Sequence, residues 1–242
     1  MDVRGAAALI TGGSRGLGAA LGRALARRGA RVVLVSRGAD ELERVVARIR
    51  AEGGEAHALV GDVGEKEAIH ALSGAAAALV GPIDVLVHNA STLGPTPLPL
   101  LLDTACEDLD RVIEVNLVGP FRLTKIVAGS MALRRRGLVV HISSDAAVVP
   151  YPGWGAYAVS KAALDQLGRV WAEELREAGV RFLSVDPGEM DTEMHAQAMP
   201  DADRRTLAAP TEVAERIAGI IAASGAIPSG TRLEASTWKL AS

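Results

Sequence analysis

A glycine-rich turn between a short apolar run and a helix is the feature that most constrains this chain. Residues 5–10 are apolar and bounded by glycine, as in a buried parallel strand. Residues 11–18 (TGGSRGLG) follow at once, and apolar residues at helical spacing come next. Glycines let a backbone turn tightly and approach a pyrophosphate, while a helix N-terminus offers free N–H donors. The spacing of Gly12, Gly16 and Gly18 departs from the general dinucleotide fingerprint, so a plain turn is the alternative to a cofactor-binding loop.

The rest of the chain repeats this order of strand and helix. Further strands are predicted at 31–36, 55–61, 83–90, 138–144, 180–185 and 229–235, and helices at 40–52, 65–80, 103–130, 157–178 and 211–223. No linker or repeat interrupts the series, so we expect one domain over residues 1–242. The predicted fold is α/β, a single doubly wound parallel sheet of the Rossmann type with helices on both faces. We expect Thr211 to cap the last helix, and residues 189–209, irregular or weakly helical, to form a mobile flap over a site.

The composition excludes several classes of protein. Hydrophobic residues make up 49% of the 242 residues, which allows a sizeable core. The formal charge of −3 lacks the basic excess of nucleic-acid-binding proteins. A lone Cys106 excludes an internal disulfide, and we expect no metal. Neither a secretory signal nor an apolar run near the ~18 residues of a membrane span is present, so we expect a soluble cytoplasmic protein without a membrane or nucleic-acid partner.

The end of the second predicted strand, Ser36-Arg37, indicates which dinucleotide the turn would bind. An acidic residue there receives the ribose 2′-hydroxyl of NAD, whereas a basic one accommodates the 2′-phosphate of NADP. Arg37 and Arg15 would offer two guanidiniums, and Arg–phosphate bonds are strong and often bidentate. NADP is therefore expected rather than NAD; the alternative is that both arginines are solvated surface charges. Asp62, at the end of the third strand, either holds an adenine amino group or caps the next helix.

Tyr157 and Lys161 are four residues apart and share one face of the helix expected at 157–178. A free tyrosine titrates near pH ~10. A cation ~4 Å away, at an effective dielectric of ~20, would lower that pKa by about three units and bring the phenol into a range useful for proton transfer. Alone, the pattern also fits a half-buried tyrosine beside a solvated lysine.

Taken together, these motifs resemble those of the short-chain dehydrogenase/reductase (SDR) family over essentially the whole chain. The matching motifs, in order, are residues 11–18, His88-Asn-Ala-Ser91, Asn116, Ser144, Tyr157 with Lys161, and Pro187-Gly188. The resemblance implies an NADP-dependent oxidoreductase that interconverts a small-molecule carbonyl and alcohol by hydride transfer. It also implies a homodimer or homotetramer that uses the helices at 103–130 and 157–178. A non-catalytic dinucleotide sensor or scaffold on the same fold, or a methyltransferase on a related sheet, is the alternative.

Four residues have catalytic roles by this resemblance. Tyr157 corresponds to the general acid/base, and Lys161 to its activator and ribose anchor. Ser144 corresponds to the hydroxyl that orients the substrate carbonyl; Ser143 is the competing candidate, but strand alternation turns it to the other face. Asn116, a poor residue for a helix interior, either bonds locally or, by the resemblance, holds a proton-relay water against Lys161.

The resemblance also implies a set of cofactor-binding residues. They are Gly12, Ser14, Arg15, Gly16, Leu17, Gly18, Ser36, Arg37, Asp62, Val63, Asn89, Ala90, Tyr157, Lys161, Pro187, Gly188 and Thr192. Two positions depart from the family's usual Asn-Asn-Ala-Gly. We expect His88 to be a structural histidine that replaces an asparagine bond in one tautomer, and Ser91 to stiffen the loop beside the cofactor.

The substrate pocket is expected at the loops 92–99, 145–155 and 189–209. Apolar side chains dominate these loops, with two carboxylates that could bind a polar group: Leu93, Val148, Val149, Trp154 and Met194, with Asp145 and Glu189. Trp154 either lines the pocket or packs in the core.

Overall fold

A computed structural model describes residues 1–239 and contains one seven-stranded sheet with parallel pairing throughout. The strand order is β3-β2-β1-β4-β5-β6-β7. The strands are β1 (Ala7–Thr11), β2 (Arg31–Ser36), β3 (Glu55–Val60), β4 (Val85–His88), β5 (Gly137–Ile142), β6 (Val180–Asp186) and β7 (Thr231–Glu234). The predicted doubly wound parallel sheet of the Rossmann type is confirmed.

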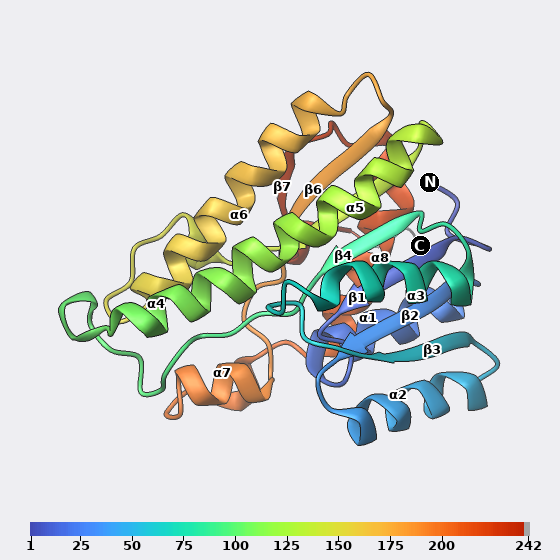
Figure 1. Ribbon diagram of the computed structural model, residues 1–242. Coiled ribbons are helices and arrows are strands. Elements are labelled where there is room, and N and C mark those ends of the chain that lie inside the picture. Colours follow the sequence, from blue (N-terminus) through green and yellow to red (C-terminus); the bar gives the residue numbers. More distant parts are fainter. Residues whose placement is uncertain (240–242) are drawn as a thin grey trace.

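Helices cover both faces of this sheet (Figure 1). They are α1 (Gly16–Arg27), α2 (Ala39–Ala51), α3 (Ala68–Val80), α4 (Cys106–Ile113), α5 (Gly119–Leu133), α6 (Gly155–Glu174), α7 (Glu193–Ala198) and α8 (Pro210–Ala223). Along β1, Ala8 and Ile10 join a core cluster with α1, α2 and α8, whereas Ala7 and Leu9 join a second cluster with α3, α5 and α6. Because the central strands β1, β2 and β4 are buried on both faces, their sequences are largely continuous apolar runs rather than alternating ones.

Several helices differ from the sequence-based expectation, among them α6, which ends at Glu174 rather than near residue 178. The stretch expected as one helix at 103–130 consists of α4 and α5 joined by a π-helical turn at Glu114–Val118. Helix α3 begins at Ala68, three residues later than expected. Helix α8 begins at Pro210, which suits the first helical position because it lacks an N–H group that would go unpaired. Thr211 therefore lies inside α8, and the expectation that it caps the helix is wrong.

The strand order reverses between β1 and β4. In open α/β sheets, ligands bind beyond the carboxyl ends of the strands at such a switch point. The glycine turn leaves the end of β1, and the loop that starts with Asn89 leaves the end of β4. The sheet therefore brings these two segments together at the edge where a ligand site is expected.

Two kinds of feature are absent from the part of the chain that the structure describes. No group of three or more His, Cys, Asp or Glu side chains in residues 1–239 is arranged to hold a metal ion. Over the same residues, every helix is too short or too polar to cross a membrane.

Candidate active site

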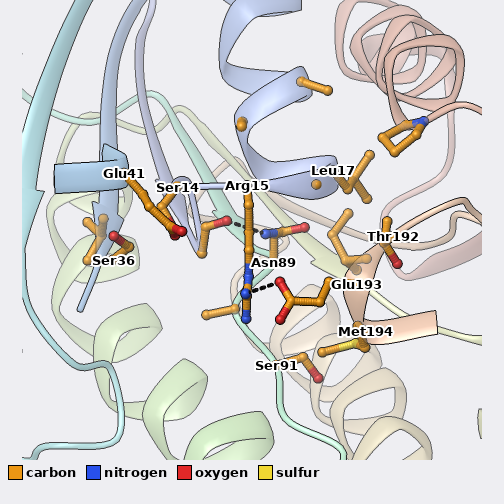
Figure 2. A pocket seen from close by; sticks show the side chains of 18 of the residues that line it. Ser14, Arg15, Leu17, Ser36, Glu41, Asn89, Ser91, Thr192, Glu193 and Met194 are labelled. Atoms are coloured by element: carbon orange, nitrogen blue, oxygen red, sulfur yellow. Dashed lines mark hydrogen bonds and ion pairs between the residues drawn. The ribbon is translucent and has the colours of Figure 1, made fainter. Parts of the chain in front are cut away.

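A cleft of about 800 Å³ is lined by both the glycine turn and the Tyr157–Lys161 pair. Figure 2 shows this cleft around Ser14, Arg15 and Leu17. Most of the predicted cofactor-binding residues line it: Gly12, Ser14, Arg15, Gly16, Leu17, Ser36, Arg37, Asp62, Val63, Asn89, Ala90, Tyr157, Lys161, Pro187 and Thr192. Four predicted residues lie outside the lining: Gly18, Asn116, Ser144 and Gly188. Two motifs that were predicted independently, one for phosphate and one for proton transfer, thus open into the same space.

Hydrogen bonds to the loop after β4 fix the glycine turn. The Asn89 side-chain amide donates to the carbonyl oxygens of Thr11 and Gly12 at 2.9 and 3.1 Å. The Thr11 hydroxyl accepts from the backbone N–H groups of Asn89 and Ala90, both at 3.1 Å. Gly18 packs directly beneath, because a Cβ atom at Gly18 would collide with the Gly12 carbonyl oxygen. The turn can adopt this compact form only because these positions lack side chains.

The N-terminus of α1 opens into the cleft. Gly16 and Leu17 line the cleft, and the N-cap residue Arg15 makes no side-chain capping bond. The first N–H groups of a helix have no intrahelical partner, and the helix dipole favours an anion at this end. The turn and the open helix end therefore fit the pyrophosphate of a nicotinamide dinucleotide.

Gly18→Ala is expected to destabilise the fold by about 1–3 kcal/mol and to weaken NADPH binding strongly, because the added methyl group forces the turn apart. Gly74→Ala is the matched control. Gly74 is an exposed residue of α3, and nothing comes within 4 Å of a Cβ atom at this position. The change should therefore add about 0.5–1 kcal/mol of stability. Urea unfolding and NADPH titration measure both effects, and equal stability of the two variants would contradict the packing argument.

The two arginines expected at a 2′-phosphate have acidic neighbours. Arg15 of the glycine turn forms an ion pair with Glu193 of α7 (Figure 2). Both residues line the cleft. Arg37 Nη1 lies 4.0 Å from Asp62 Oδ2, and Arg111 Nη2 lies 3.0 Å from the same oxygen. The side chains of Arg15 and Arg37 are 60% and 74% exposed, so these pairs contribute little to stability and their guanidiniums can change partners.

Asp62 lines the cleft and does not cap α3. Its Oδ1 accepts a hydrogen bond from the Gly64 N–H at 2.8 Å, and a turn separates it from the helix, whose N-cap residue is Glu67. The capping alternative is therefore wrong. Arg111 donates to the other carboxylate oxygen of Asp62. No sequence motif marks Arg111, because only the tertiary fold brings α4 to the end of β3.

Tyr157 and Lys161 are both buried on α6, with 8% and 2% of their surfaces exposed. Lys161 Nζ lies 5.5 Å from the centre of the Tyr157 ring and donates to the Ile142 carbonyl oxygen at 2.8 Å. Burial raises the pKa of Tyr157 to about 12 and lowers the pKa of Lys161 to about 8. The predicted lowering of the phenol pKa is thus wrong for the protein alone, because burial disfavours the charged form of each group and is the largest effect on both pKa values.

Two hydroxyls lie beside the Tyr157 phenol. Those of Ser144 and Ser91 stabilise the phenolate and partly offset the effect of burial on the pKa of Tyr157. Ser144 follows β5, and its Oγ donates to Asp145 Oδ1 at 2.9 Å. Ser143 is itself part of the cleft lining, but its hydroxyl donates to the buried carboxylate of Asp165 at 2.7 Å, so it is engaged away from the phenol. The position of Ser91 beside the phenol was not anticipated from the sequence, where it was considered only as a stiffer replacement for glycine.

Asn116 is fully buried in the π-helical turn between α4 and α5. Its Oδ1 accepts from the Thr92 N–H at 2.8 Å, while its Nδ2 donates to the Thr92 carbonyl oxygen at 2.9 Å and to Ser160 Oγ at 3.0 Å. Asn116 therefore fastens the loop after β4 to α6, the helix that carries Tyr157. Such π-turns occur frequently at functional sites. The proton-relay role of Asn116 stays a prediction.

His88 lies in the core beneath the site and is not part of the cleft lining. Its Nε2 lies 2.8 Å from Thr124 Oγ1, and its ring centre lies 5.4 Å from that of His141 on β5. Burial holds the pKa of His88 well below its usual value and lowers the pKa of His141 to about 4. These contacts are those of a structural histidine, the role expected from the sequence.

Comparison with known proteins agrees with this geometry. Residues 6–203 match the short chain dehydrogenase family. The chain belongs to the short-chain dehydrogenase family. A short chain dehydrogenase of Pseudocercospora fijiensis is 39% identical over 200 residues, which are 81% of this chain and 63% of that longer relative. Members of the family are dehydrogenases and reductases, and this member is an NAD(P)-dependent oxidoreductase.

Solved structures of other short-chain dehydrogenases have the same architecture. A metagenomic short-chain oxidoreductase in complex with NADP is 35% identical, with a TM-score of 0.78 and 92% of each chain covered. A 7α-hydroxysteroid dehydrogenase complexed with NADH and 7-oxo glycochenodeoxycholic acid is 30% identical, with a TM-score of 0.88, and the match covers 96% of this chain and 94% of that one. Both nicotinamide dinucleotides therefore occur among the structural neighbours of this dehydrogenase.

Proposed function

We propose that this chain is an NADP-dependent oxidoreductase that interconverts a small-molecule carbonyl compound and its alcohol, with Tyr157 as the general acid/base. The observation that carries the proposal is the single cleft that contains both the glycine turn and the buried Tyr157–Lys161 pair. The predicted cofactor-binding residues that line this cleft are proposed to hold the dinucleotide, and the bare backbone of the turn leaves room for its pyrophosphate.

Tyr157 is the proton donor when the carbonyl is reduced. Because burial raises the pKa of Tyr157 to about 12, the phenol is protonated at neutral pH and can transfer its proton to an oxygen that becomes negative. The neighbouring Ser144 hydroxyl, which donates to Asp145 Oδ1 in this structure, would turn to donate a second hydrogen bond to that oxygen. Lys161, which lies over the ring, stabilises the phenolate that remains. NADPH, when bound, supplies the hydride for the carbonyl carbon.

Residues 189–209 are proposed to cover the substrate. Met194 and Ala198 of α7 pack in one apolar cluster with Leu93 and Tyr157. The Trp154 ring joins this cluster, edge to face with Tyr157 at 5.7 Å between ring centres. A substrate with an apolar body next to its carbonyl group suits these walls.

NADP is proposed over NAD because two arginines, Arg15 in the turn after β1 and Arg37 after β2, line the cleft. In the Arg15→Ala/Arg37→Ala variant, the dissociation constant for NADPH is expected to rise about 100-fold or more, while that for NADH changes little, because only NADPH has the 2′-phosphate. Arg169→Ala, which removes an exposed arginine of α6, is the control. Fluorescence titration with both cofactors measures this, and an equal loss for NADH and NADPH would contradict the assignment.

The function is tested with purified protein, NADPH and a panel of ketones and aldehydes. NADPH at ~100 times its dissociation constant should add ~2.7 kcal/mol to the free energy of unfolding, and at least one apolar carbonyl compound should be turned over. Absence of NADPH binding would contradict the proposal. Binding without turnover of any carbonyl or alcohol would instead support a non-catalytic dinucleotide sensor or scaffold.

A homodimer or homotetramer and a cytoplasmic location stay predictions from the sequence. The proposed assembly is supported by apolar side chains that are exposed on α5 and α6, the helices expected at its interface. These are Phe121, Leu133, Val159 and Val170.

A further inference from the structure

Arg232, on the edge strand β7, reaches into the sheet behind the proposed active site. Its side chain is 15% exposed, and its guanidinium donates to three acceptors. Nη2 lies 2.8 Å from the Ser144 carbonyl oxygen and 2.8 Å from Asp186 Oδ2, and Nε lies 3.2 Å from Asp165 Oδ2. Each acceptor belongs to a different element: the loop after β5, the end of β6, and α6. One side chain thus ties together the segments that carry Ser144, Tyr157 and the start of the Pro187-Gly188 loop.

The two carboxylates depend on this guanidinium. The side chains of Asp165 and Asp186 are 5% and 8% exposed. Asp165 Oδ2 also accepts from the Ser143 hydroxyl, whereas Oδ1 has no hydrogen-bond partner among the described residues. Among the described residues, Asp186 Oδ1 accepts a hydrogen bond only from the Gly188 N–H. Buried carboxylates need a paired charge, and Arg232 is the cation that both of them contact.

These charges also bear on the acid/base pair. The groups that act on Tyr157 come from the loops after β4 and β5, from the end of β6 and from α6 itself: Ser91, Ser144, Asp145, Asp186 and Lys161. The two carboxylates among them oppose ionisation of the phenol, and Asp165 and Asp186 also favour the charged form of Lys161. Arg232 is in direct contact with Asp186, so it partly cancels one of the two negative charges that face the phenol.

We propose that Arg232 is a positioning residue for the reaction: it holds the main chain at Ser144 and screens Tyr157 from the Asp186 carboxylate. The inference rests on the proposed function, because it assigns Arg232 to the same proton-transfer site. Arg232 does not line the cleft, and it reaches the predicted cofactor-binding loop at Pro187-Gly188 only through Asp186. Its loss should therefore affect proton transfer and leave cofactor affinity intact.

Three variants separate the two effects. Arg232→Met should lower kcat about ten- to hundred-fold, because Ser144 loses its anchor, and should move the acidic limb of kcat/KM for alcohol oxidation up by about one pH unit. Arg232→Met/Asp186→Asn should return that limb to the wild-type position, while kcat remains low. Arg232→Lys keeps the positive charge but loses the planar guanidinium. The limb of the pH profile should therefore stay in place while kcat falls. The dissociation constant for NADPH should change by less than about twofold in all three.

Arg169→Met is the matched control, since it removes an exposed guanidinium from α6 and should leave every value unchanged. If a folded Arg232→Met variant has the same kcat as the wild type and the same limb in its pH profile, the proposal is overturned. Equal loss of kcat and NADPH affinity, with no movement of the limb, would reveal a merely structural role and overturn it as well. If Arg232→Met gives no cooperative thermal transition, Arg232→Lys decides, and a wild-type kcat there contradicts the positioning role.

A readout without turnover separates this inference from the proposed function. Tyr151 and Tyr157 are the two tyrosines of the chain, so the Tyr151→Phe background leaves Tyr157 as the one phenol whose near-ultraviolet absorbance reports ionisation. At about pH 11, Arg232→Met should contain less tyrosinate than its parent, and the added Asp186→Asn change should restore it. Inactive wild-type protein with this pattern would refute the proposed function alone; an unchanged tyrosinate fraction would refute the screening by Arg232.

Discussion

Tyr157→Phe is expected to lower turnover about 10²- to 10⁴-fold while NADPH binds nearly as tightly as to the wild type. The change removes only the phenolic oxygen, which is the proposed proton donor. The ring keeps its place between Trp154 and the apolar cluster with Leu93 and Ala146, so neither the fold nor the cleft should change. Steady-state kinetics with the best carbonyl substrate, together with NADPH titration, measure the two quantities separately.

Tyr151→Phe provides the matched control for this prediction. Tyr151 is 41% exposed, and its hydroxyl donates to Asp145 at 2.9 Å outside the apolar cluster. Loss of that hydroxyl should change turnover far less than loss of the Tyr157 hydroxyl. Similar kinetics for the two variants would mean that Tyr157 has no special role, and joint loss of turnover and NADPH binding in Tyr157→Phe would indicate a structural one.

Acidification below about pH 6.5 is expected to destabilise the fold by about 1.4 kcal/mol per pH unit for each buried histidine. Burial lowers the pKa of His141 from 6.5 to about 4 in the folded state, and it lowers the pKa of His88 as well. Between pH 6.5 and about pH 4, the unfolded chain binds a proton at His141 that the folded chain does not bind. Stability from this source is therefore complete above the unfolded pKa and is lost as the pH falls through the window between 6.5 and about 4.

Urea unfolding at a series of pH values through this window measures the slope. His141→Leu, which keeps a similar volume and removes one titrating group, should reduce the slope by about 1.4 kcal/mol per pH unit. His70→Gln is the control, because His70 is exposed on α3 and should not contribute. An unchanged slope in His141→Leu would show that the acid sensitivity arises elsewhere.

The sequence was sufficient to predict the fold, and most of the predicted cofactor-binding residues line the cleft. Buried strands on both faces leave unbroken apolar runs such as that of β1, and a glycine turn after the first of them has few structural alternatives. Tyr157 and Lys161 share a helix face by spacing alone, and alternation separates Ser143 from Ser144. Patterns that depend on neighbours in the chain could therefore be interpreted before the structure was known.

Features that depend on tertiary burial could not be predicted in this way. The expected Tyr157–Lys161 attraction ignored the cost of burying both groups, and that cost reverses the direction in which the phenol pKa shifts. Arg111 beside Asp62, and Arg232 beside Asp186, are separated from their partners by dozens of residues and carry no local motif. Only the strand order of the folded sheet brings these arginines to their carboxylate partners.

The transfer of a labelled hydride tests the central claim most directly. NADPH carrying deuterium in place of both C4 hydrogens should be turned over with a carbonyl substrate, and the alcohol analysed by mass spectrometry. We predict that each product molecule carries one deuterium on its carbinol carbon, while the hydroxyl hydrogen comes from Tyr157 and exchanges with water. Alcohol formed without deuterium on carbon, or no alcohol from any carbonyl at saturating NADPH, would contradict the account.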